Sequence, residues 1–351
     1  MQPDARAAAP GGSFYALLTA QRGPVMGAAA LWILMFHTWV SVGSSHPRLF
    51  ASLDFVRRTG FAGVDIFFLF SGIGLVFAIG RGGLGRYYYR RLKRLLVPFL
   101  AGGLLTAIGL KWSFAQTFGA LTGLSFWTED IYTLLWFVPA ISALYLVFPL
   151  YYRFFSRSKR PGLFTAAALA VWLAASLCAA GRLREDLFGF TNRVPVFLTG
   201  VWMGERGKRG WSVPWRRALP FCLPALTLGL WLSYLTNYRG LYLLVPVSNC
   251  CVPNYLIALS LAPLAAWVAA RVKPLARLLG FYGGFTLEFY CLQEINGAWL
   301  IPLLRRRLPP LAVNLAFLLF VTACAWLLSL AGAWLWRQLE GIHTRRQQIA
   351  P

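Results

Sequence analysis

The sequence predicts an all-α polytopic membrane protein, with about ten transmembrane helices in one bundle. The first observation is composition: 58% of the 351 residues are hydrophobic, 13% are charged, and the mean hydropathy is +0.59. A water-soluble domain of this length needs more polar residues to cover its surface. The second observation is that apolar runs long enough to cross a bilayer, about 20 residues, recur along the chain.

Ten apolar segments are predicted to span the membrane, and the sixth is short enough to be tilted or partly irregular. They are 24–42, 61–80, 92–110, 133–152, 162–180, 191–205, 216–235, 254–270, 276–302 and 311–336. No signal peptide with a cleavage site and no matched pair of broken helices is evident. We expect one transmembrane domain over 21–337, between a disordered cytoplasmic tail over 1–20 and a second cytoplasmic tail over 338–351.

The net charge of +23 results from 34 Lys and Arg against 11 Asp and Glu. In a soluble protein this excess would suggest a nucleic-acid partner. Here membrane orientation explains most of it, because placing both termini in the cytoplasm assigns most of the basic residues to cytoplasmic loops. The run 305–307 is an exception on the outer side. We expect membrane lipids as partners and no nucleic acid, and the scattered cysteines lack the spacing of a metal site.

A histidine interrupts the first apolar segment, in the stretch LWILMFHTWV. His37 lies about 13 residues into this span, which places it in the outer half of the membrane. From position alone, it could be a packed side chain or a catalytic group. Asp65 begins the second span at a similar depth. Its carboxylate could orient the imidazole as a general base, or it could simply cap its own helix.

Four other polar residues lie in or beside predicted spans. Ser71 is on a different helix face from Asp65, so we expect it to bond its own backbone. Glu288 lies near mid-membrane, where a carboxylate needs a cation, a hydrogen bond or a proton. Arg193, at the outer start of the sixth span, is a possible partner for Glu288. Gln293 lies further out along the ninth span.

The densest basic cluster follows the second span, in the stretch RGGLGRYYYRRLKRLLVPF. It includes Arg90, Arg91 and Arg94, interleaved with three tyrosines. The simpler interpretation is a cytoplasmic loop that meets lipid headgroups. The alternative is a cradle for a phosphate-rich ligand. Composition alone favours the first.

The stretch GVDIFFLFSGIGLVF resembles the G-V-D-x-F-F-x-x-S-G motif of the acyltransferase-3 family of integral membrane acyltransferases. Further segments follow in the family's order. They are a first helix that ends in F-H, YYYRRLKRLLVPFL, LWFVPAISALYLVFPL, RVPVFLTGVWMG and LLGFYGGFTLEFYCLQE. The resemblance covers nearly the whole chain.

This resemblance implies a ten-helix enzyme, in a bacterial inner membrane, that holds no permanent cofactor. It implies that cytoplasmic acyl-CoA, expected to be acetyl-CoA, donates an acyl group to a hydroxyl of an extracytoplasmic glycan or glycolipid. The essential base of the family corresponds to His37, and the family's basic stretch suggests a CoA-phosphate role for Arg90, Arg91 and Arg94.

The sequence departs from the family pattern at two positions. The usual first helix has an arginine where this chain has Met26, and Arg22 lies one helical turn earlier. Many relatives also have L-E-x-Y-x-x-H in the ninth helix, and Gln293 occupies the position of that histidine. A glutamine can form hydrogen bonds but cannot shuttle a proton, so we expect Gln293 to position a substrate or another side chain.

We therefore expect His37, oriented by Asp65, to deprotonate the acceptor hydroxyl; direct transfer and an acyl-histidine intermediate both remain open. The expected catalytic residues are His37, Asp65 and Glu288. The expected substrate-binding residues are Arg22, Ser71, Arg90, Arg91, Arg94, Trp136, Arg193 and Gln293. The main alternative is a glycan or lipid transporter without chemistry, for which an interior rich in Trp, Tyr and Phe would suit sugar stacking. A purely structural membrane protein is the third interpretation.

Overall fold

The protein is described here from a computed structural model, and the described residues form α-helices and no β-strand. These residues are 13–38, 40, 47–80, 82–128, 135–179, 182, 184–241 and 251–349. The helices are α1 (Phe14–Ala20), α2 (Arg22–Thr38), α3 (Pro47–Thr59), α4 (Ala62–Ala78), α5 (Gly83–Gly109), α6 (Phe114–Thr122), α7 (Leu124–Thr128), α8 (Phe137–Phe155), α9 (Pro161–Cys178), α10 (Glu185–Thr191), α11 (Val194–Lys208), α12 (Trp215–Arg239), α13 (Cys251–Arg271), α14 (Lys273–Gly283), α15 (Thr286–Arg305) and α16 (Pro310–Ile349).

Each predicted span overlaps a helix, and 7 stretches of the described residues are long and apolar enough to cross a membrane. They are Ala51–Ala78, Gly83–Gly109, Phe137–Phe155, Pro161–Cys178, Trp215–Arg239, Cys251–Arg271 and Pro310–Gly341. The predicted all-α polytopic membrane protein is therefore confirmed. The predicted disordered segment 1–20 needs correction, because Phe14–Ala20 is helical and buries Leu17 and Leu18. Helix α16 also continues into the predicted tail 338–351, as far as Ile349.

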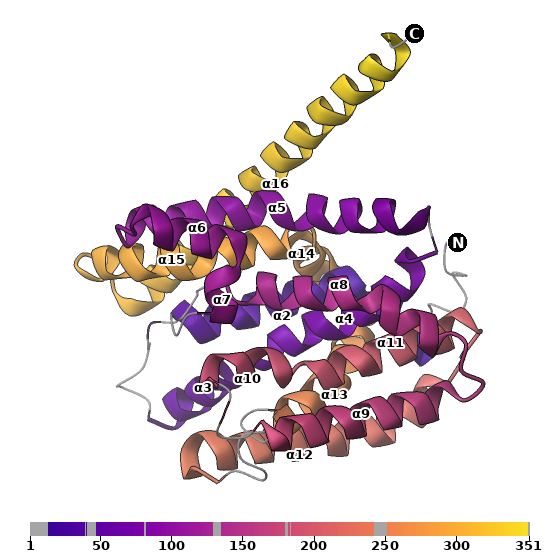
Figure 1. The fold of residues 1–351 in the computed structure, drawn as a ribbon. Coiled ribbons are helices and arrows are strands. Elements are labelled where there is room, and N and C mark those ends of the chain that lie inside the picture. The colour runs from indigo at the N-terminus through magenta and orange to yellow at the C-terminus, as the bar shows by residue number, and fades with distance from the viewer. Residues whose placement is uncertain are drawn as a thin grey trace.

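The long helices run side by side in one bundle, and the end of α16 projects away from it (Figure 1). Helices α5 and α15 lie along one side of the bundle, and α9 and α12 lie along the opposite side. Helices α2, α4 and α8 lie between these sides. Most of the candidate site residues are thus divided between the interior helices α2 and α4 and the helices α5 and α15 along one side.

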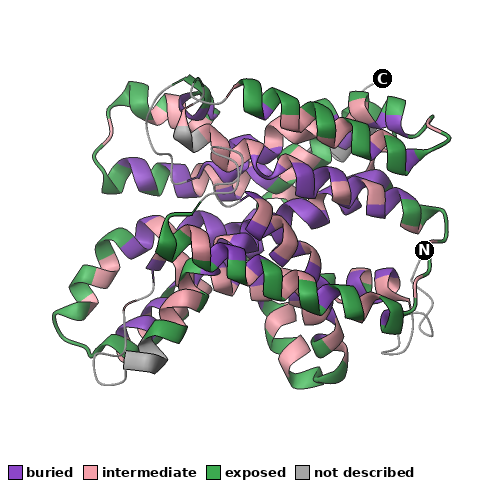
Figure 2. Cartoon of the chain, turned by 90° about the horizontal axis from the view of Figure 1, so that it is seen from below, coloured by how far each residue is buried: buried purple, intermediate pink, exposed green. Residues whose placement is uncertain are grey.

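Most residues of helix α4 are buried. The buried residues of the chain concentrate in the middle of the bundle (Figure 2). In the span that contains α4, 72% of the most apolar window is buried, against 11% in α9. Glycines let α4 lie directly against α11: a Cβ on Gly72 would meet the Phe197 carbonyl oxygen, and one on Gly200 would meet that of Leu69. Small residues at a crossing are typical of close helix association in membranes.

The ninth predicted span, 276–302, is two helices rather than one. Helix α14 ends at Gly283, and α15 begins at Thr286 after a turn at Gly284 and Phe285. The break lies where the backbones of α14 and α2 are in contact. The two are so close that a Cβ on Gly283 would clash with the carbonyl of Gly23. The expectation of an unbroken ninth helix was therefore wrong. The break places the first turn of α15 inside the bundle.

Candidate active site

A polar cavity of about 240 Å³ opens among α2, α4, α5, α8 and α15, near the start of α2. Four residues expected to bind substrate line it: Arg22, Ser71, Arg91 and Arg94. The rest of the lining comprises Gly23, Met26, Phe67, Leu95, Phe137, Tyr145, Gly283, Thr286, Leu287 and Tyr290. Three arginines and a serine around one cavity form a site suited to an anionic ligand.

The unusual first helix still supplies an arginine to this cavity. Met26 lines the wall at the position where the family has its arginine, and Arg22 lines the wall one turn earlier. Arg22 reaches α4 near Gly74, because its Nη1 would lie 3.8 Å, an ordinary contact distance, from a Cβ at that position. The arginine is thus shifted along the helix but stays on the cavity.

His37 lies on the cavity-facing side of α2, further along the helix. It follows Met26 by about three turns, or roughly 16 Å, and so projects from the same helix face. On α15, Gln293 follows the cavity residue Tyr290 by nearly one turn and likewise shares its face. The Nδ1 of His37 and the Nε2 of Gln293 are 3.1 Å apart. A line of residues on two adjacent helices thus connects the cavity to the histidine.

The Gln293 amide determines which nitrogen of His37 can act as a base. As placed, Nε2 of Gln293 donates to Nδ1 of His37, while the buried Oε1 of Gln293 has no hydrogen-bond partner among the described residues. Rotating the amide by half a turn puts Oε1 where it accepts a hydrogen bond from Nδ1–H. That tautomer leaves Nε2 of His37 unprotonated, as a general base requires. The prediction that Gln293 positions another group therefore has a specific partner.

Asp65 pairs with Arg193 and not with His37, which corrects the expected His37–Asp65 pair. Both side chains are almost completely buried, and Nε of Arg193 lies 3.5 Å from Oδ2 of Asp65. Asp65 is two residues before Phe67, so it projects from the far side of α4, away from the cavity. Similar depth was the basis of the expected pair, but the helix turns the carboxylate towards Arg193, at the start of α11.

Aromatic rings surround the Arg193 guanidinium. The ring of Phe61 lies 4.0 Å from its central carbon and that of Trp136 lies 5.2 Å away. Nη1 of Arg193 donates to the carbonyl of Gly189 at 2.8 Å. Trp136 was expected to contact substrate, and in the structure it packs against this arginine, outside the cavity lining.

Glu288 forms an ion pair with Arg94, where Arg193 had been the expected partner. Nη1 of Arg94 lies 2.9 Å from Oε1 of Glu288. The carboxylate side chain is 7% exposed and the guanidinium 48% exposed. Glu288 is in the first turn of α15, where a negative charge is favourable. Its contacts thus support a role in placing Arg94 on the cavity wall.

The two neighbouring arginines of the basic cluster differ in position. Arg91 lines the cavity, with its guanidinium carbon 5.8 Å from the ring centre of Tyr87 and 5.6 Å from that of Tyr145. Arg90 is exposed and is not part of the lining. The structure therefore places Arg91 and Arg94, but not Arg90, in one site with Arg22.

Sequence reasoning missed the aromatic residues of the cavity wall. Phe137 lies edge-on to Phe67 at 6.0 Å and to Tyr290 at 5.4 Å between ring centres. On α4 and α15 these rings are on the His37 side of Ser71 and Thr286. They therefore form the wall between the cavity and the histidine. Their helical spacing from polar cavity residues was the available signal: Phe67 is one turn from Ser71, and Tyr290 is one turn from Thr286.

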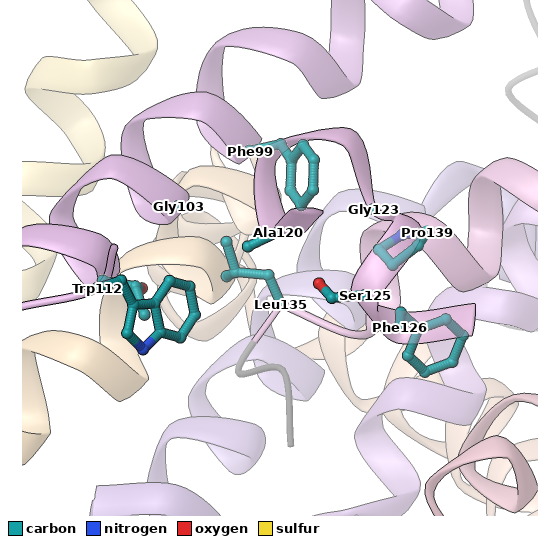
Figure 3. A pocket seen from close by; sticks show the side chains of 10 residues that line it. Phe99, Gly103, Trp112, Ala120, Gly123, Ser125, Phe126, Leu135 and Pro139 are labelled. Carbon is teal, nitrogen blue, oxygen red and sulfur yellow. The ribbon is translucent and has the colours of Figure 1, made fainter. Parts of the chain in front are cut away.

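A second cavity lies among α5, α6, α7 and α8 (Figure 3). Phe99, Leu135 and Phe126 surround it, and the buried hydroxyl of Ser125 has no hydrogen-bond partner in the part of the chain that the structure describes. Its accessible space is about 20 Å³, which is room for a single water molecule. It is too small for a substrate.

A family comparison identifies the kind of protein to which this chain is similar. The acyltransferase-3 family model, described as an acyltransferase domain, matches residues 27–330. The match includes His37, Asp65 and the lining from α4, α5, α8 and α15. No curated protein and no solved structure gives a significant match. Because the family model covers nearly the whole chain, this protein belongs to the acyltransferase-3 family of membrane acyltransferases.

Proposed function

We propose that this protein transfers an acyl group, most simply acetyl, from acyl-CoA to a hydroxyl of a glycan or glycolipid on the other side of the membrane. The observation that supports this most is the arginine-lined cavity, joined by shared faces of α2 and α15 to the His37–Gln293 pair. The charged end suits an anionic donor. The histidine end offers a base.

In this proposal, the CoA phosphates bind Arg22, Arg91 and Arg94 at the cavity. These side chains provide fixed positive charge and several N–H donors. The pantetheine arm extends along α2 and α15 towards His37, past the wall formed by Phe67, Phe137 and Tyr290. The aromatic wall must yield for the thioester to reach the base, so it favours a short acyl chain.

The chemical step is a proton transfer followed by displacement of the thiolate. Nε2 of His37 takes the proton of the acceptor hydroxyl, and the acceptor oxygen bonds to the thioester carbonyl carbon. The tetrahedral intermediate collapses as the carbon–sulfur bond breaks. The imidazolium then returns its proton to the CoA thiolate. Gln293 holds Nδ1–H throughout, so the protonated ring stays oriented.

The test is an acyl-transfer assay with the purified protein, acyl-CoA and a glycan acceptor. Transfer is measured by the release of free CoA thiol. His37→Ala is expected to lower turnover by at least about 100-fold, since a general base contributes on that order. The same variant should keep its stabilisation by acyl-CoA in thermal unfolding, because the cavity is intact. Undiminished turnover by His37→Ala would refute the assignment. A transporter without chemistry would release no CoA in either protein.

A further inference from the structure

An apolar groove of about 390 Å³ lies on the opposite side of α2 from the donor cavity, bordered by α3, α12 and α13. Its walls include Ala28 and Trp32 of α2, Phe55 of α3, Leu226 and Leu230 of α12, and Ala265 of α13. Almost all of the exposed wall is carbon. None of the cavity residues contributes to it, so the groove is separate from the proposed donor site.

The α12 side of the groove continues into tyrosines. Leu226, Leu230, Tyr234 and Tyr238 recur every four residues and therefore share one face of α12. The rings of Tyr234 and Tyr238 are stacked at 5.4 Å. Phe55, which lines the groove, contacts both rings at 6.4 and 6.2 Å. The groove thus passes directly into an aromatic layer.

Two arginines extend from this tyrosine pair. The Arg58 guanidinium lies 5.2 Å from the ring centre of Tyr238, and that of Arg239 lies 6.0 Å from that of Tyr234. Asp54 pairs with Arg58 at 2.8 Å and accepts a hydrogen bond from Tyr238 at 3.0 Å. Arg239 makes no ion pair with any residue in the described part of the chain. Positive charge is therefore in excess at this end of the groove.

We propose that the groove binds an acyl chain of an anionic membrane phospholipid, with the phosphate at Arg58 and Arg239. The order along the groove is leucine, tyrosine and then arginine. This order matches the hydrocarbon core, the interface and the headgroup layer of a bilayer. An uncharged headgroup would leave the excess positive charge without a counterion. The proposal does not depend on the acyltransferase reaction.

The test is lipid binding to the purified full-length protein, measured by native mass spectrometry. The probes are phosphatidylglycerol and phosphatidylcholine with identical chains. Phosphatidylglycerol should bind more tightly, and Arg58→Ala and Arg239→Ala should each weaken it about fivefold, since one basic side chain near anionic lipid contributes on that scale. The matched control is Arg305→Ala, at an exposed arginine that ends α15. It should bind as the unmodified protein does.

A second pair of variants tests the groove itself. Ala265→Phe fills the groove and should reduce binding of both lipids, whereas Ala167→Phe, at an exposed position of α9, should not. Equal binding of the two lipids, or equal losses in Arg239→Ala and Arg305→Ala, would overturn the proposal. Asp54 keeps its ion pair with Arg57 in Arg58→Ala. If that variant is nevertheless unstable, Arg239→Ala decides the question, since that arginine supports no described ion pair.

Discussion

Two ion pairs near the centre of this protein differ in what surrounds them. Asp65 and Arg193 are 2% and 1% exposed, and aromatic rings lie close to the guanidinium. Glu288 and Arg94 meet at the arginine-lined cavity, where the arginine side chain is 48% exposed. The first pair is sealed between α4 and α11. The second has its cation open to a ligand.

The difference indicates that the same chemical pair has two uses here. In the sealed pair, water cannot replace a lost partner, so its charges depend on each other for solvation. In the open pair, Arg94 can bind an anion while Glu288 holds its position. We therefore expect changes in the sealed pair to affect stability, and changes in the open pair to affect donor binding.

The largest expected effect comes from breaking the sealed pair. Arg193→Leu leaves the Asp65 carboxylate buried without a cation, and this should cost about 3–5 kcal/mol of unfolding free energy. Thermal unfolding of the purified protein in detergent measures the loss. The double variant Asp65→Leu/Arg193→Leu should recover much of it, because no unpaired charge remains. A single variant as stable as the unmodified protein would show that the pair is not what fastens α4 to α11.

The next largest effect concerns Gln293, which we propose orients His37. Gln293→Leu removes the partner of His37 Nδ1 and should lower kcat about 10–100-fold, matching roughly 1–3 kcal/mol for a lost buried partner. Gln293→Glu should retain more activity, because its carboxylate accepts the Nδ1–H bond. The measurement is kcat and KM for both variants. Equal losses in the two variants would mean that Gln293 acts by packing alone.

Breaking the open pair should change donor binding more than folding. Arg94→Gln removes the charge and keeps an N–H donor for Glu288, so we expect a KM for acyl-CoA raised about tenfold, or ~1.4 kcal/mol. Thermal stability should change less than in Arg193→Leu, because Arg94 is half-exposed and the glutamine still donates a hydrogen bond to the buried Glu288 carboxylate. An unchanged KM would exclude Arg94 from the donor site.

The smallest expected effects come from substitutions of two adjacent arginines, one inside and one outside the cavity lining. Arg91→Ala should raise the KM for acyl-CoA about fivefold, since one phosphate contact is lost from a partly hydrated site. Arg90→Ala is the matched control, with the same charge change one residue away and outside the cavity lining. Its KM should stay within about twofold of the unmodified value, as expected for a surface substitution. Equal effects would place both arginines on the ligand.

Much of the fold was predictable because a bilayer dictates the length and polarity of each span. Each predicted apolar segment overlaps a helix, and the motif GVDIFFLFSG identified the family that residues 27–330 match. The spacing of side chains along each helix was predictable too, since each residue advances a helix by about 1.5 Å. The break at Gly284 was not predicted, because the contact between Gly283 and Gly23 joins segments far apart in the chain.

The partners of the charged and polar residues could not be predicted from the length and polarity of the spans. Asp65 was expected beside His37, but it faces Arg193, and Glu288, for which Arg193 was the expected partner, pairs with Arg94. His37 instead meets Gln293.

By itself, the sequence determined a helical membrane protein, the places of its long apolar segments and the chemical groups spaced along each of them. The tertiary structure decided which of these groups meet. The physical reason is that a sequence fixes the height and relative rotation of side chains within one helix, whereas a contact also requires the neighbour and its orientation. Those depend on how all the helices pack together.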